Sequence, residues 1–118
     1  MKAAYAPYSK FKVGCAVRGA SGFIYTGCNI ENASYSATVC AERVAITKAI
    51  SSGEKEIVEI AIAASRGGTI SPCGVCRQVI VEFAKPKTKI LCGSAKNPSV
   101  KTFSVEKLLP FSFTKKSL

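Results

Sequence analysis

Three cysteines and one glutamate have the residue types and spacing of a catalytic metal site. Glu42 follows Cys40 by two positions, and Cys73 and Cys76 form a C-x-x-C pair further along the chain. Cysteine thiolates are good zinc ligands. Catalytic zinc sites use three protein ligands and keep one position for water, whereas structural sites are closed by four. The pattern therefore predicts a zinc-dependent reaction, with Glu42 as the group that moves protons.

The sequence contains no histidine. Histidine is the commonest metal ligand and the commonest general base in proteins, so its absence strengthens the assignment of Glu42 as the proton carrier. Three thiolates around one zinc ion leave a net negative charge. We expect Arg43 to offset this charge by hydrogen bonding to sulfur, and the alternative is an ordinary surface arginine.

The six cysteines have two interpretations. The N-terminus lacks the long apolar stretch of a secretory signal, which makes the reducing cytosol the default compartment. Cysteines there bind metals or take part in catalysis more often than they form disulfides. We therefore expect Cys15, Cys28 and Cys92, which lie in apolar strand-like runs, to be small buried hydrophobic residues. Three disulfides are the alternative.

Length and charge narrow the class of protein. The 118 residues suit one domain over 1–118, and the longest apolar run falls well short of the roughly 18 residues of a membrane span. The net charge is +10, but the lysines are spread along the chain and form no dense block with aromatic residues. We expect a solvated basic surface, with neither nucleic acid nor membrane as a partner.

Hydrophobic periodicity predicts the elements that hold these residues. Residues 12–17 and 23–28 predict two strands joined in a hairpin by a turn rich in glycine and serine. Apolar residues then repeat at helical spacing over 38–51, where Thr38 can cap the helix and Gly53 can end it. This placement puts Cys40 in the first turn of a helix, whose N-terminus favours thiolate over thiol.

Strand-like and helix-like segments also alternate in the second half of the sequence. Residues 57–63 are nearly all apolar, as in a strand covered on both faces. A helix is expected to start at Ser71-Pro72 and stop at Pro86, with Cys73 and Cys76 in its first turn. The remaining segments predict two strands and a short helix, at 89–92, 100–103 and 105–109. The order suggests an α/β sandwich with a mixed sheet.

Four motifs carry a resemblance to a known family. They are 4–11 (AYAPYSKF), 27–32 (GCNIEN), 38–43 (TVCAER) and 71–78 (SPCGVCRQ). Their order and gaps resemble cytidine deaminase of the small homotetrameric class. The resemblance implies a three-layer α/β/α sandwich with a mixed five-stranded sheet and one zinc ion per subunit. It also implies hydrolytic deamination of cytidine and deoxycytidine in cytoplasmic pyrimidine salvage.

The resemblance also assigns roles to individual residues. Cys40, Cys73 and Cys76 would ligate zinc, and Glu42 would be catalytic. The residues implied to bind the nucleoside are Phe11, Asn29, Glu31 and Ala41 and, toward the substrate of a neighbouring subunit, Ala33, Tyr35 and Phe113.

Two departures from the family pattern affect these assignments. Relatives begin with a helix before the first motif, and we expect that helix to be truncated here. Phe111 is bulkier than its family counterpart, which makes it an alternative to Phe113 as the aromatic residue that stacks on the base.

Three alternative functions stay open. The first two are deamination of cytosine in RNA or DNA and deamination of a cytosine-nucleoside antibiotic such as blasticidin S. Both use the same zinc chemistry, but Asn29 and Glu31 fit the ribose of a free nucleoside better. The third is a non-catalytic zinc-binding module, which would need a fourth protein ligand.

Overall fold

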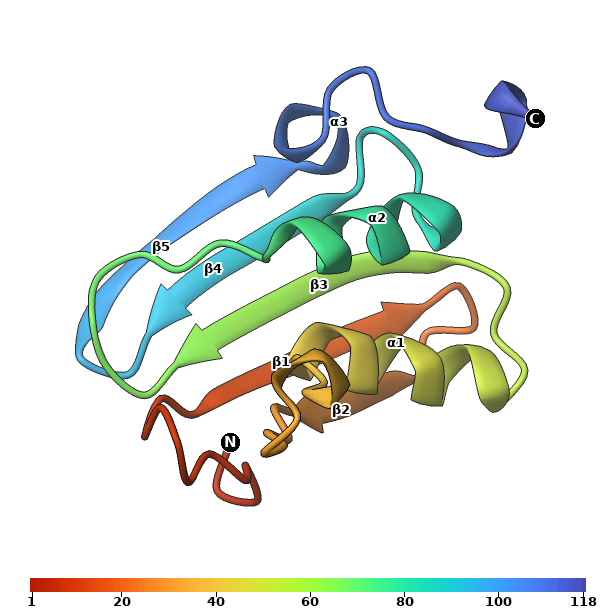
Figure 1. Cartoon of the computed structure of the whole chain (residues 1–118). Helices are drawn as coiled ribbons and strands as arrows, with labels where there is room; N and C mark the ends of the chain where they lie inside the picture. The colour runs from red at the N-terminus through yellow and green to blue at the C-terminus, as the bar shows by residue number, and fades with distance from the viewer.

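A mixed five-stranded sheet runs through the whole protein, and the helices lie against it (Figure 1). The computed structural model describes residues 1–118, apart from the side chain of Pro98. The strand order is β2-β1-β3-β4-β5. Only β3 and β4 run parallel; the other neighbouring pairs are antiparallel. The strands are β1 (Val13–Gly19), β2 (Ile24–Cys28), β3 (Ile57–Ala64), β4 (Lys89–Ser94) and β5 (Asn97–Ser104).

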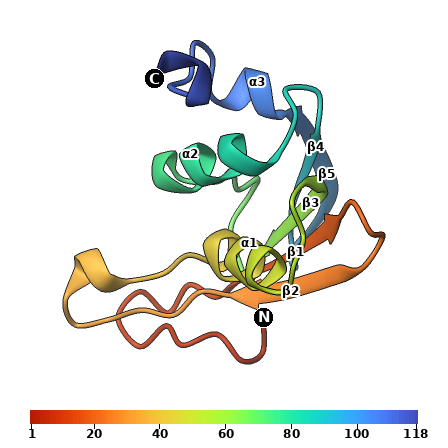
Figure 2. The ribbon, with the colours of Figure 1, turned by 90° about the vertical axis from the view of Figure 1, so that its right-hand side faces the viewer.

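The two longest helices lie on the same face of the sheet (Figure 2). They are α1 (Ala41–Ser51), which packs on β1 and β2, and α2 (Gly74–Phe83), which connects β3 to β4. The short helix α3 (Val105–Leu108) follows β5. Single 3-10 turns occur at Tyr35–Ala37 and Lys115–Ser117. Among the described residues, no helix has the length and apolar character needed to cross a membrane.

The hydrophobic core lies between these helices and the sheet. Alternate residues of β1 point into it because side chains on a strand alternate between its two faces. The α1 residues Ala45, Ile46 and Ala49 are fully buried against them, at the spacing of one helical face. Ile80 of α2 closes the core over the centre of the sheet.

The predicted α/β fold with a mixed five-stranded sheet is confirmed. The described helices α1 and α2 supply one layer, and the opposite face of the sheet is open in this chain. The apolar run at 57–63 was predicted to be covered on both faces, and this is wrong for the described chain: Val58 and Ala61 are exposed. Apolar composition marks a strand without showing which of its faces a neighbouring element covers.

Helix starts differ from the sequence-based expectation by a few residues. The first helix was expected from residue 38 but begins at Ala41. Val39 instead exchanges two backbone hydrogen bonds with Ile30, each 2.9 Å long, which keeps this stretch extended. The hydroxyl of Thr38 accepts from the Asn32 backbone and does not cap the helix. Similarly, α2 begins at Gly74, after the expected Ser71-Pro72.

Gly27 allows α1 to approach β2 closely. A Cβ atom at this position would lie 2.6 Å from the backbone nitrogen of Ala45 and 2.7 Å from the carbonyl oxygen of Ala41. Both neighbours are helix backbone, which cannot move aside as a flexible side chain would. The start of α1, and with it Cys40 and Glu42, therefore depends on glycine at this position.

We predict that Gly27→Ala lowers the free energy of unfolding by about 1–3 kcal/mol, the usual cost of forcing atoms into a packed interior. Urea denaturation followed by circular dichroism measures the change. Gly68→Ala is the matched control, because a Cβ there meets nothing within 4 Å, and it should shift stability by less than about 0.5 kcal/mol. Equal midpoints for the two variants would contradict the close approach.

Candidate metal centre and active site

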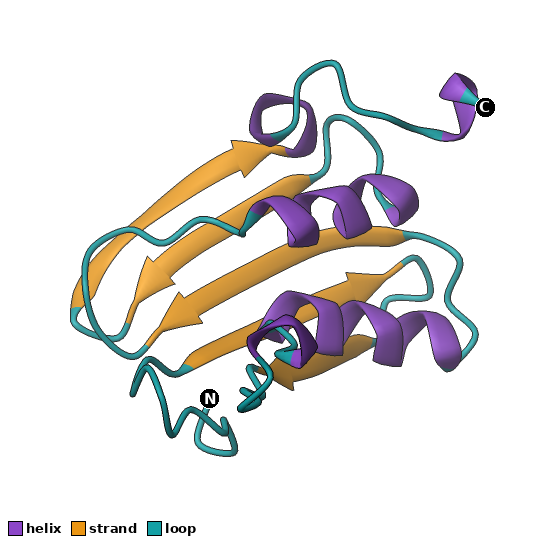
Figure 3. Cartoon of the chain, in the orientation of Figure 1, coloured by secondary structure: helices purple, strands orange, loops and turns teal.

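The site forms at one edge of the sheet, where β2 and β3 end and both long helices begin (Figure 3). Cys40 is the N-cap residue of α1, and Cys73 is the N-cap residue of α2. Cys76 is the third residue of α2. Two of the three thiols thus lie just before the first helical turns in which they were expected. Because both helices start at the same edge, cysteines from distant parts of the sequence meet there.

The three sulfur atoms have the spacing of a zinc site. The Sγ atoms of Cys40, Cys73 and Cys76 all lie within 4.8 Å of one another, and those of Cys40 and Cys73 are 3.8 Å apart. Tetrahedral zinc with Zn–S bonds near 2.3 Å requires sulfur atoms about 3.8 Å apart. The donor set and its geometry therefore fit one zinc ion.

The surroundings favour a thiolate at Cys40. Hydrogen bonds from the Cys76 thiol and from the Arg43 guanidinium lower the pKa of Cys40 to about 5, against the opposing effect of partial burial. The pKa of Cys76 is raised above its usual range instead, because its thiol donates to Cys40 and is buried. Within the cluster, the negative charge is therefore favoured on Cys40.

Outside the cluster, burial raises the pKa of Cys15 above its usual range and that of Cys92 to about 11. Cys15 and Cys92 are buried core residues, as predicted. The same prediction is wrong for Cys28, which is only half-buried because it ends the edge strand β2.

Glu42 is a buried carboxylate beside these sulfurs. It is the second residue of α1 and only 4% exposed. Burial raises the pKa of its carboxyl group, while its place at a helix N-terminus favours the charged form. None of the ion pairs found in the described part of the chain includes Glu42. A carboxyl group with a raised pKa and no ion-pair partner is suited to accept and return a proton.

The two neighbouring arginines have different roles. The Nη2 atom of Arg43 lies 3.6 Å from the Cys40 sulfur and donates to the Thr38 carbonyl at 3.2 Å. This is the contact with sulfur that the sequence suggested. Arg77 donates instead to the carbonyl oxygens of Pro72 and Leu108, both at 2.7 Å. It therefore ties the start of α2 to the end of α3.

A cavity of about 250 Å³ opens onto Cys40, Cys73 and Glu42. Four residues expected to bind a nucleoside line it: Phe11, Asn29, Glu31 and Ala41. The sequence analysis gave no substrate-binding role to Ser9, Thr38, Ile70 or Ser71, which line the cavity as well. Ser9, Thr38 and Ser71 lie inside the motifs quoted above and could have been proposed from them. Ile70 carries no sequence signal, because an isolated apolar residue in a loop has no periodicity.

Asn29 and Glu31 are held firmly at the wall of this cavity. The Asn29 side chain accepts from the Val13 backbone N–H at 2.9 Å and donates to the Phe11 carbonyl at 2.8 Å. The Glu31 carboxylate accepts from the backbone N–H groups of Tyr8 and Ser9 and from the Ser9 hydroxyl. These bonds, the Ser9 hydroxyl first, hold the pKa of Glu31 below its usual value. Glu31 is thereby kept charged and oriented.

The residues expected to reach a neighbouring subunit do not line this cavity. Ala33 is exposed, Tyr35 is 77% exposed and Phe113 is 59% exposed. The Phe113 carbonyl accepts a hydrogen bond from Gln78 on α2, whereas Phe111 is fully exposed. In the single chain these side chains are therefore available for contacts outside it.

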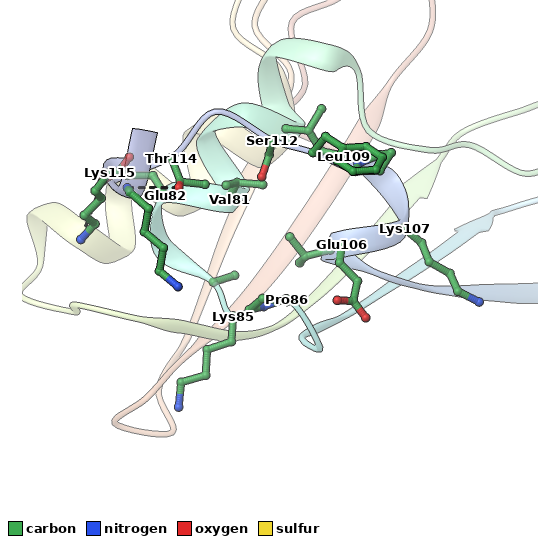
Figure 4. A pocket seen from close by; sticks show the side chains of 15 residues that line it. Val81, Glu82, Lys85, Pro86, Glu106, Lys107, Leu109, Ser112, Thr114 and Lys115 are labelled. Atoms are coloured by element: carbon green, nitrogen blue, oxygen red, sulfur yellow. Dashed lines mark hydrogen bonds and ion pairs between the residues drawn. The ribbon is translucent and has the colours of Figure 1, made fainter. Parts of the chain in front are cut away.

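A second, larger cavity lies elsewhere (Figure 4). It measures about 770 Å³ and lies between the end of α2, α3 and the C-terminal segment. Its two carboxylates are paired with lysines, Glu82 with Lys115 and Glu106 with Lys87. Size alone therefore does not mark the chemical site; the smaller cavity is lined by two thiols of the cluster and by the buried carboxylate.

Comparison with known proteins agrees with this geometry. Residues 1–92 match the family model described as the cytidine and deoxycytidylate deaminase zinc-binding region. The chain belongs to this family. All three thiols of the cluster, and Glu42, lie within the matched residues.

Relatives in the family match nearly the whole chain. A cytidine deaminase from Sporosarcina psychrophila is 48% identical over 98% of this chain and 84% of its own length. A cytidine deaminase from Halalkalibacterium halodurans is 44% identical over 94% of this chain and 83% of its own length. The crystal structure of cytidine deaminase from Burkholderia pseudomallei superposes with a TM-score of 0.89 at 41% identity, covering 95% of this chain and 89% of that one. The α/β fold is thus shared with this family member.

We predict that Cys73→Ala lowers zinc affinity by more than about 100-fold. Loss of a residue that hydrogen-bonds to a metal ligand lowers affinity about 10–100-fold, and loss of a ligand itself should lower it further. Zinc content after dialysis against a graded series of chelator concentrations measures this. Cys28→Ala is the control, since Cys28 lies in β2 outside the cluster, and it should keep the metal. Equal zinc retention by both variants would contradict the assigned ligand set.

Proposed function

We propose that this protein catalyses the hydrolytic deamination of cytidine and deoxycytidine to uridine and deoxyuridine, with release of ammonia. One observation carries the proposal: Cys40 and Cys73 of the thiol cluster and the buried Glu42 open onto the same cavity as Phe11, Asn29 and Glu31. The first group supplies the chemistry of deamination, and the second forms a wall suited to a nucleoside.

Cys40, Cys73 and Cys76 would hold one zinc ion, and zinc bound in such a site brings the pKa of a coordinated water toward neutrality. Glu42 accepts a proton from the attacking water and transfers it to N3 of the cytosine ring, which makes C4 more electrophilic. After the water oxygen has bonded to C4, Glu42 takes the remaining proton from that oxygen and passes it to the exocyclic amine. The C4–N bond then breaks and ammonia leaves. One carboxyl group thus acts first as base and then as acid.

The charge balance of the site supports this role for Glu42. Three thiolates and a divalent metal carry a net charge of −1, and a second negative charge at Glu42 lies close by. The Arg43 guanidinium, 3.6 Å from the Cys40 sulfur, offsets part of this charge. Burial opposes ionisation of Glu42. The protonated form of Glu42 is therefore easier to reach than that of a solvated carboxyl group, as a proton shuttle requires.

The other wall of the cavity would orient the nucleoside. Asn29 and Glu31 are held in fixed positions by the chain before β1, and we assign them to the ribose hydroxyls. Phe11 and Ala41 would contact the nucleoside as well. Fixed polar groups cost less entropy on binding than mobile ones, so an anchored Glu31 is well suited to select a sugar.

The exposed residues point to assembly. We propose that the enzyme acts as a cytoplasmic homotetramer in pyrimidine salvage. In this assembly Ala33, Tyr35 and Phe113 would reach the substrate of a neighbouring subunit. The exposure of Tyr35 and Phe113 in the single chain supports this proposal.

A non-catalytic zinc-binding module is less well supported. Within the described residues the metal-binding group contains three cysteines and no fourth ligand, whereas structural zinc sites are closed by four. Cys92, a cysteine outside this group, is fully buried in the hydrophobic core. An open coordination position favours catalysis.

We predict that Glu42→Gln reduces turnover of cytidine by at least about 100-fold, the low end of what a positioned acid–base group contributes, while zinc content stays unchanged. Loss of cytidine absorbance measures the rate, and prior treatment with a zinc chelator should abolish it in the wild type. Glu59→Gln is the control, because Glu59 lies in β3 and pairs with Arg18 at the surface. Near-normal activity of Glu42→Gln would refute the mechanism.

We predict that the wild-type enzyme prefers free nucleosides. Cytidine and deoxycytidine should be turned over at least about 100-fold more efficiently than a cytosine-containing oligonucleotide or blasticidin S, because a wall built to bond ribose rejects compounds that leave its polar groups unpaired. The comparison uses kcat/KM values from ammonia release. A preference for the oligonucleotide would favour nucleic acid as the substrate and link it to the +10 charge.

A further inference from the structure

Arg66 contacts the nucleoside wall of the cavity from a different part of the chain. It lies two residues beyond the end of β3, in the loop that leads to Cys73. Its guanidinium carbon is 5.3 Å from the centre of the Phe11 ring, in the geometry of a cation–π contact. Its Nη2 atom also donates to the Ser9 carbonyl at 3.1 Å.

These two contacts reach the residues that orient the cavity wall. The Ser9 backbone N–H and hydroxyl bond to the Glu31 carboxylate. The Phe11 backbone N–H donates to the Ser9 hydroxyl at 3.0 Å, and the Phe11 carbonyl accepts from Asn29. A single guanidinium therefore touches both ends of the turn that carries Phe11 and anchors Glu31.

The backbone next to Arg66 is fastened to the same segment. The Ser65 N–H donates to the Lys12 carbonyl at 2.8 Å, and the Lys12 N–H donates to the Ser65 hydroxyl at 3.1 Å. This reciprocal pair continues the β1–β3 pairing beyond the end of β3. It limits where the Arg66 side chain can reach and directs it toward the turn at 9–11.

Electrostatic attraction to an acid does not explain the position of Arg66. It belongs to none of the ion pairs among the residues that the structure describes. The π face of Phe11 and the Ser9 carbonyl are the partners that the structure shows. Both belong to the cavity wall.

We propose that Arg66 is a positioning residue for substrate binding: it fixes the Phe11 ring and the Ser9–Glu31 contact, and links this wall to the loop that carries Cys73. The proposal rests on the proposed nucleoside deaminase function. Arg66 acts through Phe11 and Ser9 and touches neither the metal ligands nor Glu42. Its loss should therefore weaken nucleoside binding and leave the chemical step nearly unchanged.

The first experiment measures binding without turnover. In the Glu42→Gln background, calorimetry gives the Kd for cytidine with and without Arg66→Ala. Loss of one exposed cation–π contact and one hydrogen bond should raise Kd by about five- to tenfold. Arg66→Lys keeps the charge but not the planar guanidinium, and should raise it by about two- to threefold. Arg18→Ala, which removes an exposed arginine paired with Glu59, should leave Kd unchanged.

The second experiment separates KM from kcat with Glu42 intact. Arg66→Ala should raise KM for cytidine by about five- to tenfold and lower kcat by less than about twofold. Zinc content and the urea midpoint serve as checks that the variant is folded and loaded. A fall in kcat with unchanged KM, or an effect no larger than that of Arg18→Ala, would overturn the proposal.

A double-mutant cycle tests whether Arg66 acts through the Phe11 ring. Phe11→Leu keeps an apolar wall but removes the π face. In that background Arg66→Ala should raise KM by less than about threefold, since only the Ser9 contact remains to be lost. Full additivity of the two substitutions would overturn the role assigned to Phe11.

A wild-type enzyme that neither binds nor deaminates cytidine refutes the proposed function itself. An active wild type with an unaffected Arg66→Ala variant refutes only the positioning role of Arg66.

Discussion

The convergence of three thiols is the constraint on which the rest of the structure depends. Sulfur atoms within 4.8 Å of one another repel strongly once ionised, unless a cation or hydrogen-bond donors compensate them. The chain meets this demand by starting α1 and α2 at the same edge of the sheet and placing Cys40 and Cys73 at their N-caps. The positive ends of two helix dipoles and the Arg43 guanidinium then face the sulfurs. The parallel pairing of β3 and β4 requires a crossover connection, and α2 supplies it.

The same edge of the sheet lowers the free-energy cost of burying the Glu42 carboxyl group. A carboxyl group that is 4% exposed loses most of its hydration, which disfavours its charged form. The N-terminus of α1 stabilises the charged form in part, through the helix dipole and its free N–H groups. The two effects oppose each other, and burial is the larger, so the pKa of the carboxyl group stays above its usual value. Close packing of α1 on β2 at Gly27 keeps this balance at one fixed position.

The wall opposite the metal ligands is built from loops, and its order comes from hydrogen bonds between segments far apart in sequence. Asn29 and Glu31 after β2 bond to the turn before β1. Ser65 and Arg66 after β3 bond to the same turn. Short loops that are fixed in this way can present polar groups to a ligand without the entropy cost of ordering them on binding. A small domain thereby gains a rigid binding wall without using a strand or helix for it.

The sequence by itself determined the element order, the thiol set and the choice of Glu42, because each depends on local patterns. Alternating or helical spacing of apolar residues marks an element wherever it lies, and metal ligands are recognised by residue type and spacing. Only the tertiary structure decided that Val39 pairs with Ile30, so that α1 begins later than expected. It also decided that Arg77 bonds to the end of α3 and that Arg66 reaches Phe11. Arg66 and Ser9 are 57 residues apart, and no local pattern encodes such a contact. Their contact depends on the pairing of β1 with β3, and that pairing is set by the packing of the whole core.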